Sequence, residues 1–296
     1  MYTLRPYQKA AHDAVIEWIK GCLDPCLIEA ATGSGKSLII AAIAHTIHQM
    51  SGKKILCIAP SGELVVQNYE KYRAFGEPAS LFSASVGQKD MRHHVVFGTP
   101  GTVANQVRKF GRQFAAVVID EAHGVTPTLM KIIDHMRQQN PKLRIVGLSA
   151  TPFRLGPGYI YAHHYQYGAM DEAIDPFFHT LVYAIGGREL IDGGYLTPPA
   201  FEATQEYYDT SGLKLSKAGQ FTAASLDKAF VGRGRKTAGI VADVVEQSRN
   251  RQGVMIFAAT VQHAKEIMES LPPDNSRMLG GDVNMKKNPI RAIRYE

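Results

Sequence analysis

The sequence has few of the features that mark secreted, metal-binding or membrane proteins. Its 296 residues include only three cysteines, Cys22, Cys26 and Cys57, which form neither an even disulfide set nor the four ligands of a structural zinc site. The longest apolar run, Leu38 to Ala44, is far too short to cross a bilayer, and the N-terminus has no apolar signal-peptide core. We therefore expect reduced thiols, no membrane partner and a cytoplasmic protein.

Composition and charge place the chain among ordinary globular proteins. Hydrophobic residues make up 45% and charged residues 20% of the sequence, which is enough for one large or two medium domains. The formal net charge of +6 suits a polyanionic partner, although an excess of this size does not identify one.

The segment Ala30 to Ser37 reads Ala-Ala-Thr-Gly-Ser-Gly-Lys-Ser, between an apolar run and a helix-like run. Glycines in a strand-to-helix loop let backbone N–H groups turn inward, and the helix N-terminus adds partial positive charge, so the pattern predicts a polyphosphate site. The loop begins with Ala30 where the P-loop pattern has glycine, and a Gly/Ser linker is the alternative. Lys36 is expected to reach the phosphates of ATP, and Ser37 to ligate Mg²⁺. The predicted nucleotide-binding residues are Thr32, Gly33, Ser34, Gly35, Lys36 and Ser37.

Short apolar runs alternate with polar turns and helix-like segments along the first half of the chain. This order predicts an α/β fold with a parallel sheet. The expected strands cover residues 26–28, 53–59, 95–99, 115–119 and 144–148.

Two carboxylates, Asp120 and Glu121, directly follow the expected strand 115–119. The carboxyl ends of parallel strands lie on one rim of a sheet, so both side chains should lie near the P-loop. We expect Asp120 to hold Mg²⁺ and Glu121 to activate the attacking water, and Lys36 to assist catalysis. An acidic helix N-terminus is the alternative explanation.

The N-terminal segment Leu4 to Gln8 precedes apolar residues at helical spacing, with Pro6 in the first turn. The amide of Gln8 presents both a donor and an acceptor, as an adenine edge requires. A solvated glutamine is the alternative.

The expected organisation is a first domain at 1–155, a connecting and accessory segment at 156–235 and the start of a second α/β domain at 236–296. Tyrosines and histidines between 159 and 167 can stack on bases or pack between domains, and composition does not decide between the two. The expected second domain begins with a strand at 254–259.

Seven segments occur in the order of the superfamily 2 helicase motifs, which the chain therefore resembles. A narrower resemblance, to the bacterial RadD-type DNA repair ATPases, is carried by residues 147–156, 194–199 and 253–267. The seven segments are Leu4–Gln8, Ala30–Ser37, Ala59–Pro60, Gly98–Gly101, the Asp-Glu-Ala-His sequence Asp120–His123, Ser149–Pro152 and Ile256–Ala258.

The resemblance implies two RecA-like domains, with ATP between them and DNA on the opposite face. It assigns Gln8 and Arg5 to adenine. It assigns His123, Ser149 and Thr151 to coupling between hydrolysis and strand movement. It also implies a single-stranded DNA-binding or repair protein as a partner. The residues it assigns to the nucleic-acid backbone are Ser61, Gly62, Gln67, Thr99 and Gly101.

The sequence also departs from the family pattern. Motifs V and VI are missing, and the cationic patch 231–236 has neither the sequence nor the position of motif VI. The cysteine-rich zinc region of RadD-type proteins is missing as well. These departures suggest a helicase core that is truncated after motif IV and lacks its finger arginines.

The leading hypothesis is an ATP-dependent motor that hydrolyses MgATP in response to DNA, without base-sequence preference. Two other functions stay open: a P-loop ATPase that acts on a small molecule, and an ATP-gated DNA-binding module without turnover.

Overall fold

The computed structural model describes residues 3–154, 157–200, 206–216, 221–251 and 254–271. The chain divides into two compact units, Met1–Pro198 and Pro199–Glu296. The first unit extends beyond the expected boundary at residue 155, because a strand formed by Phe178–Ile185 joins its sheet.

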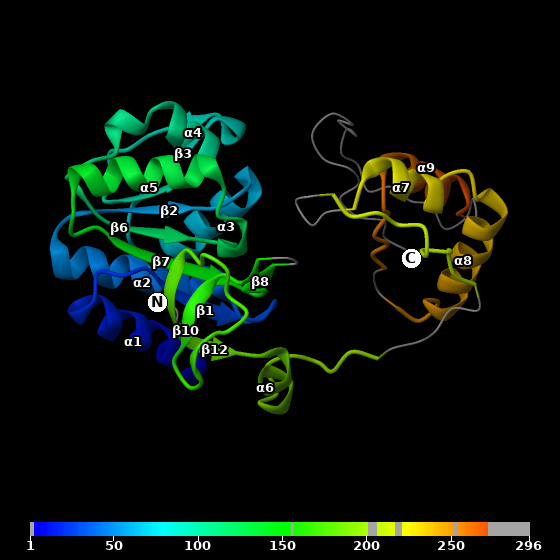
Figure 1. Ribbon diagram of the computed structural model, residues 1–296, viewed down its shortest axis with the longest axis horizontal. Coiled ribbons are helices and arrows are strands. Elements are labelled where there is room, and N and C mark those ends of the chain that lie inside the picture. The colour runs from blue at the N-terminus through cyan, green and yellow to red at the C-terminus, as the bar shows by residue number, and fades with distance from the viewer. Residues whose placement is uncertain (1–2, 155–156, 201–205, 217–220, 252–253, 272–296) are drawn as a thin grey trace. The chain divides into compact units, whose positions relative to one another are not determined.

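The first unit is built on a ten-stranded sheet in the order β11-β10-β12-β1-β7-β6-β2-β5-β3-β4 (Figure 1). Neighbouring strands run parallel except at the two edges, where β11 and β4 are antiparallel to their neighbours. The expected α/β class with a parallel sheet is thereby confirmed. The strands are β1 Cys26–Ala30, β2 Lys54–Ile58, β3 Ala79–Ser83, β4 Gln88–Lys89, β5 Val95–Gly98, β6 Phe114–Ile119, β7 Arg144–Ser149, β10 Tyr161–His164, β11 Gly168–Ala169 and β12 Phe178–Ile185.

Helices cover both faces of this sheet, which explains why its strands are almost continuously apolar. Successive side chains point to opposite faces, so Ile28 packs under α1 and α2 while Leu27 packs under α5. Figure 1 shows α4 and α5 on one side of the strands and α1 and α2 on the other. The helices of this unit are α1 Pro6–Gly21, α2 Lys36–Ser51, α3 Gly62–Arg73, α4 Pro100–Asn105, α5 Pro127–Gln139 and α6 Gly187–Asp192.

Local sequence signals set the helix starts as expected. Pro6 stands in the first turn of α1, and Ser61 caps α3 by accepting a hydrogen bond from the Leu64 amide at 3.3 Å. Thr126 caps α5 in the same way, through the Leu129 amide. Short 3₁₀ turns occupy Ala84–Val86, Val107–Lys109 and Ala122–Gly124, and a two-stranded ribbon joins β8 Phe153–Arg154 to β9 Gly158–Tyr159.

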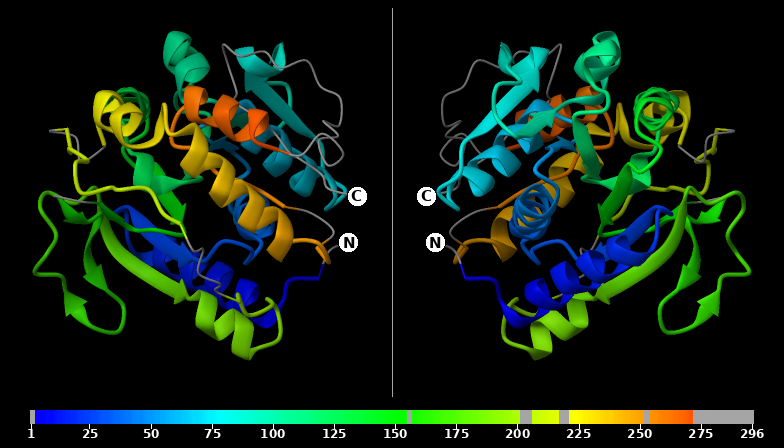
Figure 2. Two further views of the ribbon diagram at one scale, coloured as in Figure 1. Left: turned by 90° about the vertical axis from the view of Figure 1, so that its right-hand side faces the viewer. Right: turned by 90° about the vertical axis from the view of Figure 1, so that its left-hand side faces the viewer.

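The sequence pattern did not predict two of the strands, β3 and β12. β3 contains two serines among its five residues, and β12 contains His179 and Thr180, so neither reads as a continuous apolar run. Both segments are strands because each one pairs in parallel with a neighbour in the sheet. β3 pairs with β5, and β12 pairs with β1. The tyrosine- and histidine-rich segment thus continues the sheet through β10 and β11, along the edge beside β12 (Figure 2).

The second unit contains three described helices, α7 Ala223–Phe230, α8 Gly234–Gln247 and α9 Val261–Glu269. Val241, Ile267 and Leu271 form its small core. The expected strand 254–259 is wrong for the described residues, where Phe257 is 86% exposed and only Val254 forms an isolated bridge. A strand requires a neighbour, and no other strand of this unit lies among the described residues.

Two expectations concern residues that the structure does not describe. The ends of two quoted motifs, 155–156 and 253, fall there, as does the last part of the expected second-domain segment, 272–296. The start of a second RecA-like domain at 236 therefore stays a prediction. Among the described residues, no helix is long and apolar enough to cross a membrane.

The three thiols differ strongly in their surroundings, and all are free, as expected. Burial raises the pKa of Cys26 to about 12, and it also raises the pKa of Cys57, whereas Cys22 is only half-buried. Because the thiolate is the reactive form, burial should make the first two thiols inert.

We therefore expect a thiol reagent to label one cysteine of the native chain quickly, and all three only after denaturation. Cys22→Ser should remove the fast reaction and leave the other two thiols slow. Fast labelling of a second thiol in the native protein would contradict the burial of Cys26 and Cys57.

Candidate active site

The P-loop connects β1 to α2 in a tight turn that only glycine tolerates at two positions. Gly33 and Gly35 have φ values of +85° and +80°, a region that side chains with a Cβ rarely adopt. A Cβ at Gly35 would also lie 2.6 Å from the Gln8 amide nitrogen, and one at Gly33 would lie 2.8 Å from a Leu196 methyl. Gln8 and Leu196 thus pack against the two loop glycines. The first backbone N–H groups of α2 lie at the end of the same loop, where they can bind phosphate.

Two side chains of helix α1 bind the P-loop by hydrogen bonds to the Ser34 carbonyl oxygen. This oxygen accepts hydrogen bonds from the Tyr7 hydroxyl at 2.8 Å and from Gln8 Nε2 at 2.9 Å. Gln8 is 2% exposed, and its Oε1 accepts the Arg5 amide at 2.9 Å. Each polar atom of the Gln8 amide keeps one further bonding position, so the residue supports the loop and can still meet a base edge.

The Arg5 guanidinium, expected at the adenine, lies beside the P-loop among aromatic rings. It lies 5.1 Å from the ring centroid of Tyr195, and its Nη1 donates to the Tyr7 hydroxyl at 3.3 Å. The rings of Tyr7 and Tyr195 meet edge to face, with centroids 4.9 Å apart. A planar cation stacked among aromatic rings offers the kind of surface on which a base can stack.

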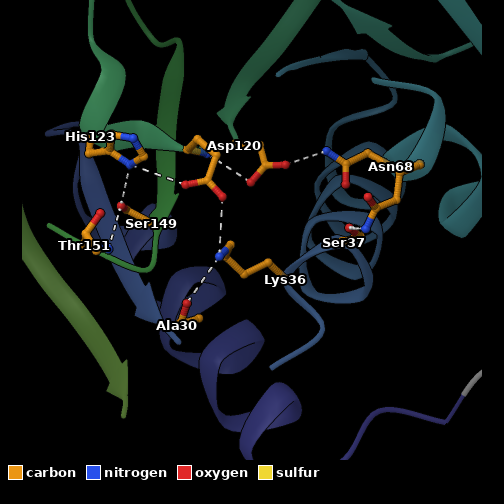
Figure 3. A network of polar contacts seen from close by, with 10 residues as sticks. Ala30, Lys36, Ser37, Asn68, Asp120, His123, Ser149 and Thr151 are labelled. Atoms are coloured by element: carbon orange, nitrogen blue, oxygen red, sulfur yellow. Dashed lines mark hydrogen bonds and ion pairs between the residues drawn. The ribbon is translucent and has the colours of Figure 1, made fainter. Parts of the chain in front are cut away.

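Lys36, the first residue of α2, reaches across to the end of β6 (Figure 3). Its ammonium lies 3.5 Å from Glu121 Oε1 and 3.5 Å from the Ala30 carbonyl oxygen. The structure thus brings together the P-loop lysine and the carboxylate expected to activate water, from segments far apart in the sequence.

Asp120 lies buried directly after β6. It is 6% exposed, and its two oxygens accept hydrogen bonds from the Asn68 amide at 2.8 Å and from the Glu121 backbone N–H at 3.0 Å. Burial raises the pKa of Asp120, which the hydrogen bond from Asn68 opposes. Glu121 follows in the left-handed region at φ +50°, which turns its side chain back toward Lys36.

The three residues expected to couple hydrolysis to movement form one cluster. His123 Nδ1 lies 3.1 Å from Ser149 Oγ and 3.3 Å from Glu121 Oε2. Ser149 Oγ also accepts the Thr151 amide at 3.1 Å. Arg154 clamps this turn from β8, because its guanidinium donates to the His123 carbonyl (Figure 3 shows the labelled His123, Ser149 and Thr151).

Four of the five expected nucleic-acid residues lie at the carboxyl ends of β2 and β5. Ser61 and Gly62 begin α3, while Thr99 and Gly101 lie at the start of α4. The Thr99 hydroxyl lies within hydrogen-bond distance of Ser83 Oγ, at 3.1 Å, and of Thr102 Oγ1, at 3.0 Å. Gln67 differs from the others, because its amide donates to Ser37 Oγ at 3.2 Å and so lies at the nucleotide site.

Sequence reasoning missed several residues of this site: Tyr7, Asn68, Arg154, Tyr195 and Leu196. Asn68 left a detectable signal, since it shares the buried face of α3 with Val65 and Tyr72, where an apolar side chain is expected. Arg154 and Tyr195 gave none, because their contacts depend on distant segments.

The chemistry of these groups fits a magnesium–nucleotide complex. Ser37 and Asp120 supply the oxygen ligands that Mg²⁺ prefers, and Lys36 and the α2 amides supply positive charge for phosphates. Ser34 Oγ is buried in the loop and has no partner among the described residues, so it can accept a group that enters there. No cluster of three His, Cys, Asp or Glu side chains suited to a metal occurs in the described part of the chain.

Comparison with known proteins finds relatives that include RNA and DNA helicases. The ATP-dependent RNA helicase dbp8 of Sclerotinia sclerotiorum is 32% identical over 128 residues, which cover 35% of this chain and 24% of that protein. The ATP-dependent DNA helicase mph1 of the same fungus is 30% identical over 149 residues, or 45% of this chain and 12% of that protein. This chain therefore spans a quarter or less of these curated relatives.

Among solved structures, the UvsW helicase of bacteriophage T4 matches with a TM-score of 0.43 and 25% identity, over 51% of this chain and 54% of that one. The family model described as "Type III restriction enzyme, res subunit" matches residues 1–154 of the 296, which include the P-loop, Asp120–His123 and the Ser149–Pro152 segment. The chain belongs to this family.

Proposed function

We propose that this chain binds and hydrolyses MgATP to drive movement on DNA, in the manner of a RadD-type repair ATPase. The observation that carries the proposal is the meeting of Lys36 and Glu121, 3.5 Å apart, next to the buried Asp120. A cation for the phosphates, a base for water and a metal ligand are the three parts that phosphoryl transfer requires.

Each residue has a distinct part in this mechanism. Lys36 and the amides of the P-loop bind the phosphates, while Ser37 and Asp120 hold the metal. Bound Mg²⁺ supplies positive charge that stabilises the departing phosphoryl group. Glu121 orients the attacking water and accepts its proton. The close contact between Glu121 and His123 links that carboxylate to Ser149 and Thr151.

The choice of DNA rests on the resemblance of residues 147–156, 194–199 and 253–267 to RadD-type proteins. The relatives include an RNA helicase and a DNA helicase, so the test must include both polymers. ATP hydrolysis should be measured with single-stranded, duplex and forked DNA and with matched RNA, at one salt concentration.

We expect DNA to stimulate hydrolysis more than RNA does. Hydrolysis that ignores both polymers would favour a small-molecule ATPase instead, and nucleotide-dependent DNA binding without turnover would favour a gated binding module. Stronger stimulation by RNA would overturn the substrate assignment alone.

Substitutions should separate binding from hydrolysis. Lys36→Ala removes the phosphate-binding cation, so we expect loss of ATP binding in a nucleotide titration. Glu121→Gln keeps the shape of the side chain and one acceptor oxygen but not its basicity, so ATP should still bind while hydrolysis falls by about 10²–10⁴-fold.

Lys142→Ala is the matched control, because this exposed lysine lies at the opposite end of the sheet, just before β7. It should leave both ATP binding and hydrolysis unchanged. A Glu121→Gln protein that hydrolyses ATP at the parent rate would show that another group activates the water.

Nucleic-acid affinity should come from phosphate contacts rather than base reading, because the candidate residues are hydroxyls and glycines at helix starts. We expect the logarithm of the binding constant to fall linearly with that of the salt concentration, by about 0.7 per phosphate contacted on a single strand. Fluorescence anisotropy with oligonucleotides of equal length and different sequence measures both effects. A strong preference for one sequence at constant salt contradicts this mode of binding.

A further inference from the structure

Asn68 is the least expected side chain of the site. It lies on the buried face of α3 and is 2% exposed, in line with the apolar Val65 and Tyr72. A leucine would suit such a position better, because a buried polar group is unfavourable unless it is fully hydrogen-bonded. The asparagine therefore needs partners for both ends of its amide.

Only one end of this amide has a partner within the described chain. Nδ2 donates to Asp120 Oδ2 at 2.8 Å, as an ionised carboxylate requires, whereas the buried Oδ1 accepts no hydrogen bond from any described residue. Figure 3 shows Asn68 beside its carboxylate partner, Asp120. A buried acceptor held beside a predicted metal ligand is suited to a donor that arrives with the metal.

The same helix also reaches the other predicted metal ligand. Gln67, the preceding residue, donates to Ser37 Oγ at 3.2 Å. Two consecutive side chains of α3 thus contact Ser37 and Asp120, which come from the start of α2 and the end of β6. Mg²⁺ in nucleotide sites keeps several of its waters, and each of these waters is a strong hydrogen-bond donor.

We propose that Asn68 is a positioning residue for the hydrated metal: its Nδ2 orients Asp120, and its Oδ1 accepts a hydrogen bond from a water of Mg²⁺. This inference rests on the proposed function, in which Asp120 holds that ion. Groups that support metal ligands in this way commonly change metal affinity by about 10–100-fold when they are removed.

The decisive measurement is the Mg²⁺ dependence of nucleotide binding, with a fluorescent non-hydrolysable ATP analogue as the probe. In Asn68→Leu, which removes both the donor and the acceptor, we expect unchanged affinity for the analogue in EDTA. The Mg²⁺ concentration needed for half-maximal tightening should rise about 10-fold or more. Glu70→Gln, an exposed change on the same helix, should behave like the parent.

Thermal unfolding without nucleotide separates this role from a structural one. If Asn68 served only to stabilise the core, Asn68→Leu would lower the unfolding temperature and leave the Mg²⁺ requirement unchanged. We expect the Mg²⁺ requirement to rise in any case. The change in unfolding temperature should be small, because removal of the orphaned Oδ1 favours folding while loss of the donor to the buried Asp120 Oδ2 opposes it.

A second variant keeps the test decisive if Asn68→Leu fails to fold. Asn68→Asp retains the shape and the acceptor oxygens but places a second carboxylate beside Asp120. We expect its unfolding temperature to rise more with Mg²⁺ and the analogue than that of the parent does. A rise no larger than the parent's would overturn the proposal.

The Mg²⁺ dependence of nucleotide binding also distinguishes a failure of this inference from a failure of the proposed function. A parent-like Mg²⁺ requirement in Asn68→Leu overturns the role of Asn68 and leaves the proposed function intact. A parent chain whose nucleotide binding ignores Mg²⁺ overturns the proposed function itself, and this inference with it.

Discussion

The parallel pairing of β1, β7 and β6 is the constraint on which the site depends. β7 lies between the other two, with Glu29 opposite Ser149 and Ile119 opposite Gly147. Because all three strands run in one direction, their carboxyl ends meet at one rim of the sheet. The P-loop, Asp120–His123 and Ser149–Pro152 follow directly from those ends, so a shift in pairing would separate Lys36 from Glu121.

Helices provide the second layer of support for this rim. α1 holds the P-loop through two hydrogen bonds to the Ser34 carbonyl, and α3 contacts Ser37 and Asp120 through adjacent side chains. These contacts tie the candidate nucleotide site to helices whose apolar faces belong to the core. A rigid support of this kind keeps reacting groups in place, which is worth more to catalysis than additional contacts would be.

The site also contains groups that a stable core would exclude. Asp120 is buried with a raised pKa, and Ser34 Oγ and Asn68 Oδ1 are buried without partners in the described chain. Each is unfavourable for folding by itself, since desolvated polar atoms lose their hydrogen bonds to water. All three lie where phosphates and a hydrated metal are expected. A bound ligand can therefore supply the hydrogen-bond partners that these atoms lack in the folded chain.

The sequence by itself determined the class of fold and predicted the candidate catalytic groups. The apolar runs of β1, β2, β5, β6 and β7, the glycines of the P-loop and Asp120-Glu121 at a strand end are local signals that need no knowledge of distant contacts. Tertiary structure alone decided that β3 and β12 are strands, that Gln67 contacts Ser37, and that Arg154 clamps the turn of His123. These features depend on pairing and packing between segments far apart in the chain. A single stretch of sequence therefore does not predict them.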